Sequence, residues 1–422
     1  MSNRKEPSKA GEFDTDAIKC SVGAVIARGV TVPEPPRHKT LNTIEDQQYT
    51  ETTVSADGDL LNDLECLLHS QTSLKGWNIS AVSSSRPNPQ GGIGYVAKWL
   101  VRQAYDGIGI DKALIRVKNL ALTNTAKARI VIAIHGLQLD KAINLCPGFR
   151  LVPFGSLPKS SSKAALLRSP REPGAFVPAG VWFGPDVALI HEYDICPVFI
   201  GDENDQEIQE RPVDMQCLMD IVSCLTVAGI NAPLPLAYWH EFCPDYPVID
   251  LSRIPTLIGH NVLTASRIHG FKYYFDDCLA NEIVDSFTAL SVSTRDSLRV
   301  PLQRLNLALR RSALVDVAIE LRIALEAILL SKNKGSGELK YRMQCRAARL
   351  LGNNLATRKE IFDSVKEVYD LCSGAVHTGQ LGKKINKLKN TIWDGVELCC
   401  KLIRKIIERG EIPDWSKIEM GD

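Results

Sequence analysis

The segment at residues 316–330 constrains the fold more than any other part of this sequence, because it is apolar on almost every side of a helical projection. A helix that is apolar nearly all round must be buried, so this segment predicts the centre of a helical bundle. Its few charged residues include Arg322 and Glu326, which lie four positions apart. Opposite charges at this spacing pair on a helix, and the pair lowers the cost of burying either side chain.

The segments around this buried one have the apolar period of amphipathic helices. They lie at residues 279–292, 297–311, 338–351, 361–376 and 385–406. Each of these segments has an apolar stripe that can face a common core and a polar side that can face water. Together they predict an all-α helical bundle over residues 276–412, followed by a tail at 413–422.

The chain before the bundle has a different pattern. Residues 1–55 are rich in charge, Ser, Thr and Pro, which predicts a flexible leader. Residues 56–215 contain β-branched runs such as 129–134, which predict a β-rich module. Several prolines punctuate the mixed connector expected at 216–275. The expected fold class is therefore α+β, with a β-rich N-terminal module followed by an all-α bundle.

Composition narrows the classes of partner. A formal net charge of +1 over 422 residues excludes a protein that coats nucleic acid along its whole surface, so any RNA contact must be local. None of the 12 cysteines forms a Cys-x-x-Cys pair, and we expect no metal site. Without an N-terminal apolar signal or a long uncharged apolar run, we expect a cytoplasmic protein with no membrane partner.

His377 stands at the end of the predicted helix that begins near Ile361. An isolated His at such a place is most simply a half-exposed residue favoured by the helix macrodipole. The residues around His377 form a longer pattern that changes this interpretation. They read Val-Tyr-Asp-Leu-Cys-Ser-Gly-Ala-Val-His-Thr-Gly over 368–379.

The order of these helices and their motifs resembles the HEPN superfamily, and within it the Apea-like branch. The matching segments are 324–327 (Ala-Leu-Glu-Ala), 337–339 (Gly-Glu-Leu), 346–351 and 369–377. The resemblance covers about the last third of the chain. The stretch at 134–158 also resembles the region that precedes Apea-like domains. The expected bundle is therefore of the HEPN type.

The resemblance implies metal-independent RNA cleavage at the interface of a homodimer, with no cofactor. The family motif is Arg-x4-6-His, in which His moves protons and Arg stabilises charge on the scissile phosphate. His377 occupies the His position, whereas Cys372, Leu371 and Asp370 occupy the positions at which Arg is expected. The motif therefore lacks its cation, and losing one such contact typically lowers the rate about 10²–10³-fold.

Two interpretations of the missing cation stay open. In the first, an Arg of the preceding helix takes its place, so that the catalytic residues are His377, Arg346 and Arg349. Contacts to RNA would then come from Arg342, Lys383, Lys384 and Lys387, and the supporting residues would be Glu326, Arg322, Tyr369 and Cys372. The same cations also fit the solvated sides of amphipathic helices.

In the second interpretation the site is inactive. The bundle would then serve dimerisation or binding, and the N-terminal module would recognise a ligand or a partner protein. For the first interpretation, the resemblance implies an RNA-targeting effector of a bacterial defence or stress system, such as antiphage defence.

Overall fold

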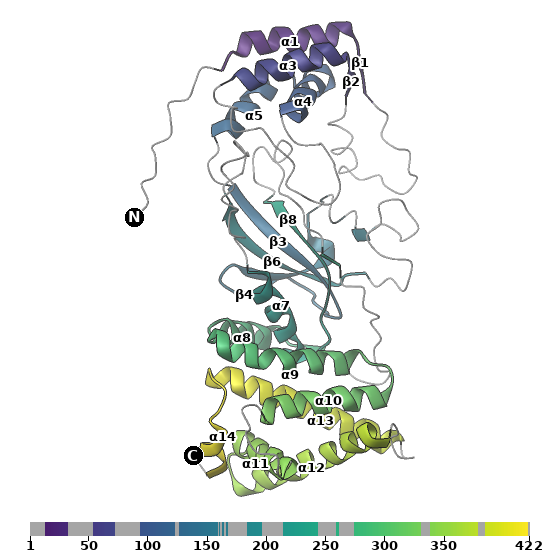
Figure 1. The fold of residues 1–422 in the computed structure, drawn as a ribbon, viewed down its shortest axis with the longest axis vertical. Helices are drawn as coiled ribbons and strands as arrows, with labels where there is room; N and C mark the ends of the chain where they lie inside the picture. Colours follow the sequence, from purple (N-terminus) through teal and green to yellow (C-terminus); the bar gives the residue numbers. More distant parts are fainter. Residues whose placement is uncertain are drawn as a thin grey trace, which may run out of the picture.

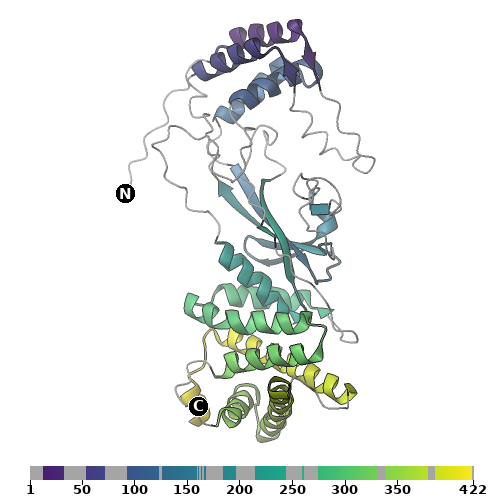
Figure 2. The same cartoon turned by 45° about the vertical axis from the view of Figure 1, so that its right-hand side comes forward.

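The computed structural model contains a helical layer, a sheet and a helical bundle, in that order from the N-terminus (Figure 1). The same order is visible after a turn of the molecule (Figure 2). The expected combination of α and β structure with a helical C-terminal region is confirmed. The structure describes residues 13–32, 54–71, 93–122, 126–158, 160, 163, 166–167, 184–195, 214–243, 259–260, 274–330, 338–378 and 385–420.

Apart from a short helix near residues 99–104, the helical layer was not expected from the sequence, which predicted a flexible leader and then strands. It consists of α1 (Thr15–Arg28), α3 (Gly58–Ser70), α4 (Ile93–Asp106) and α5 (Ile110–Leu122), with the short pair β1 (Val30–Thr31) and β2 (Ser55–Ala56). Ile18, Val22 and Val25 of α1 recur at helical spacing and are buried against Leu64 and Trp99. This small apolar face is enough to order a helix in a charge-rich stretch, because neighbouring helices cover it.

The first strand of the sheet begins at Ala126, within the β-rich module predicted at 56–215. It has six antiparallel strands in the order β4-β5-β6-β3-β8-β9. Their bounds are β3 (Ala126–His135), β4 (Ile143–Cys146), β5 (Phe149–Pro153), β6 (Val187–Ile195), β8 (Leu234–Phe242) and β9 (Gly259–His260). The central strand β3 contains the predicted β-branched run at 129–134. The short run at 198–200 also has the composition of a strand, and it lies outside the described residues.

The two faces of the sheet belong to different apolar clusters. Ile130, Ile132 and Ile134 of β3 join the large core shared with the bundle, whereas Val131 and Ala133 face the opposite side. This alternation follows from the two-residue period of a strand. The face toward the bundle shares its large core, whereas the opposite face is covered by residues such as Phe154 and Leu166.

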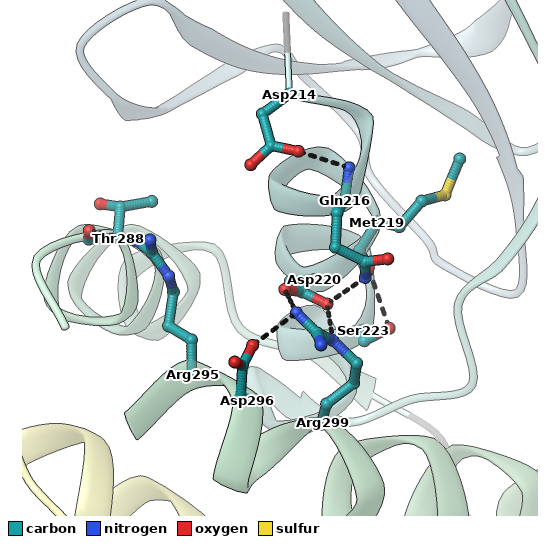
Figure 3. A network of polar contacts seen from close by, with 9 residues as sticks. All are labelled: Asp214, Gln216, Met219, Asp220, Ser223, Thr288, Arg295, Asp296 and Arg299. Atoms are coloured by element: carbon teal, nitrogen blue, oxygen red, sulfur yellow. Dashed lines mark hydrogen bonds and ion pairs between the residues drawn. The ribbon is translucent and has the colours of Figure 1, made fainter. Parts of the chain in front are cut away.

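The first part of the expected connector packs against the bundle, whereas β8 and β9 of the same range belong to the sheet. This first part contains α7 (Met215–Cys224), the 3-10 turn η3 (Leu225–Val227) and β7 (Gly229–Ile230), which pairs with β10 (Tyr274–Phe275). Asp220 of α7 is buried and accepts two hydrogen bonds from Arg299, at 2.9 and 2.8 Å (Figure 3). Gln216 donates a third, at 2.8 Å. This network fixes α7 to the first long helix of the bundle.

The bundle surrounds the helix that the sequence placed at its centre. Its helices are α8 (Asp277–Thr288), α9 (Val292–Arg310), α10 (Leu314–Leu329), α11 (Leu339–Leu351), α12 (Leu355–Thr378), α13 (Ile385–Arg409) and α14 (Trp415–Met420). The central helix α10 packs against α9, α11, α12 and α13. The last helix, α14, replaces the expected tail, because Trp415 and Ile418 are buried beside α11. No helix in the described part of the chain has the length and apolar character needed to cross a bilayer.

Candidate functional site

The candidate site is built on α12. Asn354 accepts a hydrogen bond from the amide of Thr357 at 2.9 Å and so caps the start of this helix. Its apolar stripe, with Val365, Val368 and Cys372, is almost fully buried. The helix continues to Thr378, so the backbone of His377 lies in its last turn and not in a loop.

The contact between α10 and α12 brings together the four residues predicted to support the site. Arg322 donates from Nε to Glu326 Oε1 at 2.7 Å and from Nη2 to the hydroxyl of Tyr369 at 3.4 Å. Its guanidinium carbon lies 5.1 Å from the centre of the Tyr369 ring. Cys372 follows one turn later on α12 and is fully buried. The hydrogen bond and the cation–π contact from Arg322 to Tyr369 therefore join the two helices, whereas the ion pair with Glu326 lies within α10.

The charges of this contact act on one another. The hydrogen bond to Glu326 raises the pKa of Arg322, so the guanidinium is charged at any physiological pH. Burial raises the pKa of the Cys372 thiol to about 12, although Arg322 acts in the opposite direction. The thiol at the expected Arg position is therefore neutral. Arg322 is a positive charge that acts on this thiol, and Glu326 is a negative one.

Arg346, predicted as a catalytic cation, lies where α11 meets α10 and α14. Its side chain is 5% exposed and donates from Nε to Glu419 Oε1 at 2.7 Å and from Nη1 to the carbonyl of Leu329 at 2.5 Å. The guanidinium also lies 5.3 Å from the centre of the Trp415 ring. These contacts engage both sides of the guanidinium, and they explain Arg346 as a link between α10, α11 and α14.

The direction of α11 separates the predicted Arg stripe from His377. Gln344 of α11 donates to the carbonyl of Phe362, and Lys340 pairs with Asp370, so α11 and α12 run antiparallel. Arg346 therefore lies beside the first half of α12. The rise from Phe362 to His377 is roughly 22 Å along the helix axis. Within one copy of the chain, the structure does not bring Arg346 to the turn that carries His377.

The remaining predicted cations are spread over two helices. Arg342 and Arg349 are half-buried on α11, the first near its start and the second in its last turn. Lys387 is exposed in the first turn of α13. Lys383 and Lys384 lie outside the described residues. Lys387 is therefore the predicted RNA contact that the structure leaves most accessible to solvent.

Lys340 was missed by the sequence analysis. Its Nζ lies 2.5 Å from Asp370 Oδ1, so it offsets the carboxylate that would otherwise repel a phosphate near His377. The two residues are 30 positions apart, and only the antiparallel packing of α11 on α12 brings them together. Both side chains are partly exposed, so the pair contributes little to stability.

The sheet carries a second group of polar and aromatic residues. Tyr193 shares a 2.8 Å hydrogen bond with His240 Nδ1, and His191 stacks on Phe149 with ring centres 4.3 Å apart. Burial raises the pKa of Tyr193 to about 12. Glu241 accepts a hydrogen bond from Arg129 on one oxygen and from Trp239 on the other.

One cluster in the described residues has the spacing of a metal site. It consists of Asp276, Asp277 and Cys278 at the start of α8, where the residues are partly or fully exposed. Asp276 is the N-cap of this helix and accepts a hydrogen bond from the amide of Leu279 at 2.9 Å. Helix capping accounts for the position of this carboxylate without an ion.

Comparisons with known proteins found no match to this chain among family models, curated proteins or solved structures. The resemblance to the HEPN superfamily therefore stays an interpretation of the motifs in the sequence. The α10–α12 contact is the part of the structure that contains the motif residues Tyr369 and Cys372.

Proposed function

We propose that the protein is an RNA-targeting effector of the HEPN type, acting as a homodimer in a bacterial defence or stress system in the cytoplasm. It is a metal-independent endoribonuclease or a degraded form of one. The observation that supports this proposal is the α10–α12 contact. There, Arg322 and Tyr369, 47 positions apart, meet beside Cys372, one to two turns before His377.

The proposed chemistry needs only proton transfer and a nearby cation. An imidazole removes the proton of a ribose 2′-hydroxyl, and the 2′-oxygen attacks the adjacent phosphorus. The bond from phosphorus to the 5′-oxygen breaks, and that oxygen receives a proton from a second acid. In a homodimer the two copies of His377 can fill these two roles, since an imidazole titrates near neutral pH.

Contact with the RNA backbone is assigned to Lys387 and Arg342, together with Lys383 and Lys384. Lys387 is exposed on α13, as a phosphate contact must be. With a net charge of +1 on the whole chain, such contacts would be few. The affinity for RNA would then fall only moderately with salt, because few counterions are released.

A second candidate function is non-catalytic. The bundle would form a dimer, and the N-terminal module would recognise a ligand or a partner protein. Two observations favour it: Cys372 places a buried, neutral thiol where the motif has a cation, and the guanidinium of Arg346 is occupied by Glu419 and Leu329. A protein of this kind would dimerise without cleaving RNA.

The experiment that separates the two functions is cleavage of labelled tRNA and single-stranded RNA in EDTA. Wild type is compared with His377→Ala and with the matched control His69→Ala, which removes an exposed His from the last turn of α3. The nuclease proposal expects cleavage that survives chelation, is lost in His377→Ala and is kept in His69→Ala.

A stable dimer without cleavage in any of the three proteins would instead support the binding function. Light scattering after size-exclusion chromatography measures the dimer in the same samples. Cleavage that disappears in EDTA would contradict both proposals, since neither includes a metal.

A further inference from the structure

One face of the sheet carries a group of aromatic rings that takes no part in the site on α12. Antiparallel register places Phe149 of β5 opposite His191 of β6, and His240 of β8 lies on the same face beyond β3. Tyr193 follows two positions after His191, so it lies on this face as well. All four side chains are half-exposed.

These rings lie between two apolar cores. Phe149 and Tyr193 pack at the margin of the large core that the sheet shares with the bundle. Phe242, the next residue of β8 on this face, is buried in the core of the helical layer. The half-exposed rings are therefore the part of this face that neither core covers completely.

The Tyr193 side chain extends across the central strand. Its hydroxyl shares the 2.8 Å hydrogen bond with His240 Nδ1, although β6 and β8 lie on opposite sides of β3, roughly 10 Å apart. The residue of β3 directly opposite Tyr193 is Ala128, whose methyl group leaves room for a ring above the strand. The hydrogen bond therefore holds the Tyr193 ring over the middle of the sheet.

The contacts among the rings leave Tyr193 without a close stacking partner. Phe149 and His191 form a closed stack, with centres 4.3 Å apart and planes at 16°. The rings of His191 and Tyr193 are also nearly parallel, at 23°, but their centres are 6.4 Å apart. His240 meets Tyr193 edge-on, at 83°. Among the described residues, no ring lies at stacking distance on either face of Tyr193, so a planar group can stack there.

Charge indicates which planar group this is. Register places no Asp, Glu, Lys or Arg of the six described strands on this face, whereas the opposite face has pairs such as Lys127–Asp194 and Arg129–Glu241. An uncharged aromatic surface suits a neutral ring better than a phosphate group or a charged peptide. Unpaired RNA bases present such rings, and they stack on aromatic side chains with little dependence on sequence.

We infer that Tyr193, between His191 and His240, stacks an unpaired base of single-stranded RNA. This inference rests on the function proposed above, which assigns the phosphate contacts to the bundle. The sheet would then select single strands over duplexes, because the bases of a duplex are already stacked and paired.

The test measures binding of short single-stranded RNA to the full-length protein by fluorescence anisotropy. The RNA carries 2′-O-methyl groups, which block the attacking oxygen and so prevent cleavage, and a duplex of the same sequence and free AMP are measured beside it. Tyr193→Leu removes the ring, whereas Tyr193→Phe keeps the ring and removes the hydroxyl. The matched control is Tyr105→Leu, which removes a Tyr of α4 that is 49% exposed. Thermal unfolding verifies that each variant is folded.

We expect Tyr193→Leu to weaken binding of the single strand about 10- to 100-fold, as the loss of one base–aromatic stack does. Tyr193→Phe and Tyr105→Leu are expected to stay within about twofold of wild type. The ratio between wild type and Tyr193→Leu should not change with salt, because stacking releases no counterions. Binding of the duplex should not depend on Tyr193.

Three results would overturn the inference. They are an unchanged affinity in Tyr193→Leu, an equal loss in Tyr193→Phe, which would assign the effect to the hydroxyl, and binding of free AMP as tight as that of the RNA.

Cleavage of unmodified RNA in EDTA distinguishes this inference from the proposed function. Cleavage by wild type with an unchanged affinity in Tyr193→Leu would leave the nuclease and remove the stacking role. Binding that depends on Tyr193, without cleavage, would contradict the nuclease and retain the stacking role. If wild type neither binds nor cleaves RNA, both are wrong.

Discussion

Two Arg residues of the bundle, Arg322 at the α10–α12 contact and Arg346 at the α11–α14 contact, have similar partners and different surroundings. Each pairs with a Glu at 2.7 Å, and each lies just over 5 Å from an aromatic ring centre. Arg346 also donates to the carbonyl of Leu329 and is 5% exposed. The Arg322 side chain is 19% exposed, but its Nη1 is buried and has no hydrogen-bond partner.

The two guanidinium groups differ in whether Nη1 has a hydrogen-bond partner. Arg346 satisfies a carbonyl at the end of α10, and losing that bond would leave a polar group unpaired in the core. Arg322 instead leaves its buried Nη1 without a hydrogen-bond partner. Helical spacing in the sequence cannot reveal this difference, because it depends on which helix end each side chain meets.

The largest effect is expected from Cys372→Arg, which restores the family motif in the sequence. Cys372 is fully buried beside a guanidinium that is already charged, so a second one would be desolvated and repelled. We expect a loss of about 3–5 kcal/mol in the free energy of unfolding, measured by chemical denaturation, and no gain in RNA cleavage.

Cys66→Arg, at an exposed position of α3, provides the control for the added charge and is expected to change stability by less than about 0.5 kcal/mol. A stable and more active Cys372→Arg protein would show that the position opens toward the substrate. The description of Cys372 as a buried, neutral residue of the α10–α12 contact would then be wrong.

The next largest effect is expected at the α7–α9 contact, which extends the comparison to a third Arg. Arg299→Met would leave Asp220, whose side chain is 6% exposed, with only the hydrogen bond from Gln216 (Figure 3). We expect a loss of about 3 kcal/mol in the free energy of unfolding, because a buried carboxylate would lose its charged partner.

Arg295→Met is the matched control on the same helix. Arg295 donates one hydrogen bond to the carbonyl of Thr288 at 3.0 Å, so its loss is expected to be about 1 kcal/mol. Equal losses in the two variants would mean that the Asp220 pair contributes no more than a single neutral hydrogen bond.

Arg346→Met is expected to lower the free energy of unfolding by about 2 kcal/mol. The substitution leaves the carbonyl of Leu329 without its donor and removes the cation–π contact with Trp415. Arg349→Met, three residues further along α11, is the control, since Arg349 forms no hydrogen bond or ion pair with the described residues. The order of these two losses, measured by urea denaturation, would be reversed if Arg349 were the structural residue.

The sequence predicted those parts of the bundle that depend on one helix at a time. The 316–330 segment is apolar nearly all round and became the central helix α10, and the Arg322–Glu326 pair was expected from spacing alone. Arg346 was assigned a catalytic role, and its structural role was not predicted because its partner Glu419 lies 73 positions away, in a stretch predicted to be a tail. Only the packing of α14 on α11 brings these two residues together.

The N-terminal part also contains helices that the sequence did not predict, because they depend on contacts between segments. Charge and Pro around α1 outweighed its short apolar stripe, and α3 to α5 were included in a module expected to be β-rich. Each of these helices is short and has a narrow apolar face, so its stability comes from the neighbours that cover that face. The central strand β3 was predictable because its β-branched run has the composition of a strand buried on both faces.

The smallest expected effect, that of Tyr369→Phe, is the most specific test of the α10–α12 contact. The hydroxyl accepts from Arg322 at 3.4 Å, a long hydrogen bond, while the ring itself provides the cation–π contact. Tyr369→Phe is therefore expected to lower the free energy of unfolding by less than about 0.5 kcal/mol, and Tyr369→Leu by more. A double-mutant cycle with Arg322→Met measures the coupling directly. If the ring holds the guanidinium, the cycle with Tyr369→Phe gives a coupling energy near zero and the cycle with Tyr369→Leu gives a larger one. If the hydroxyl holds it, both cycles give similar coupling energies, and the orientation of Arg322 depends on the hydroxyl together with Glu326.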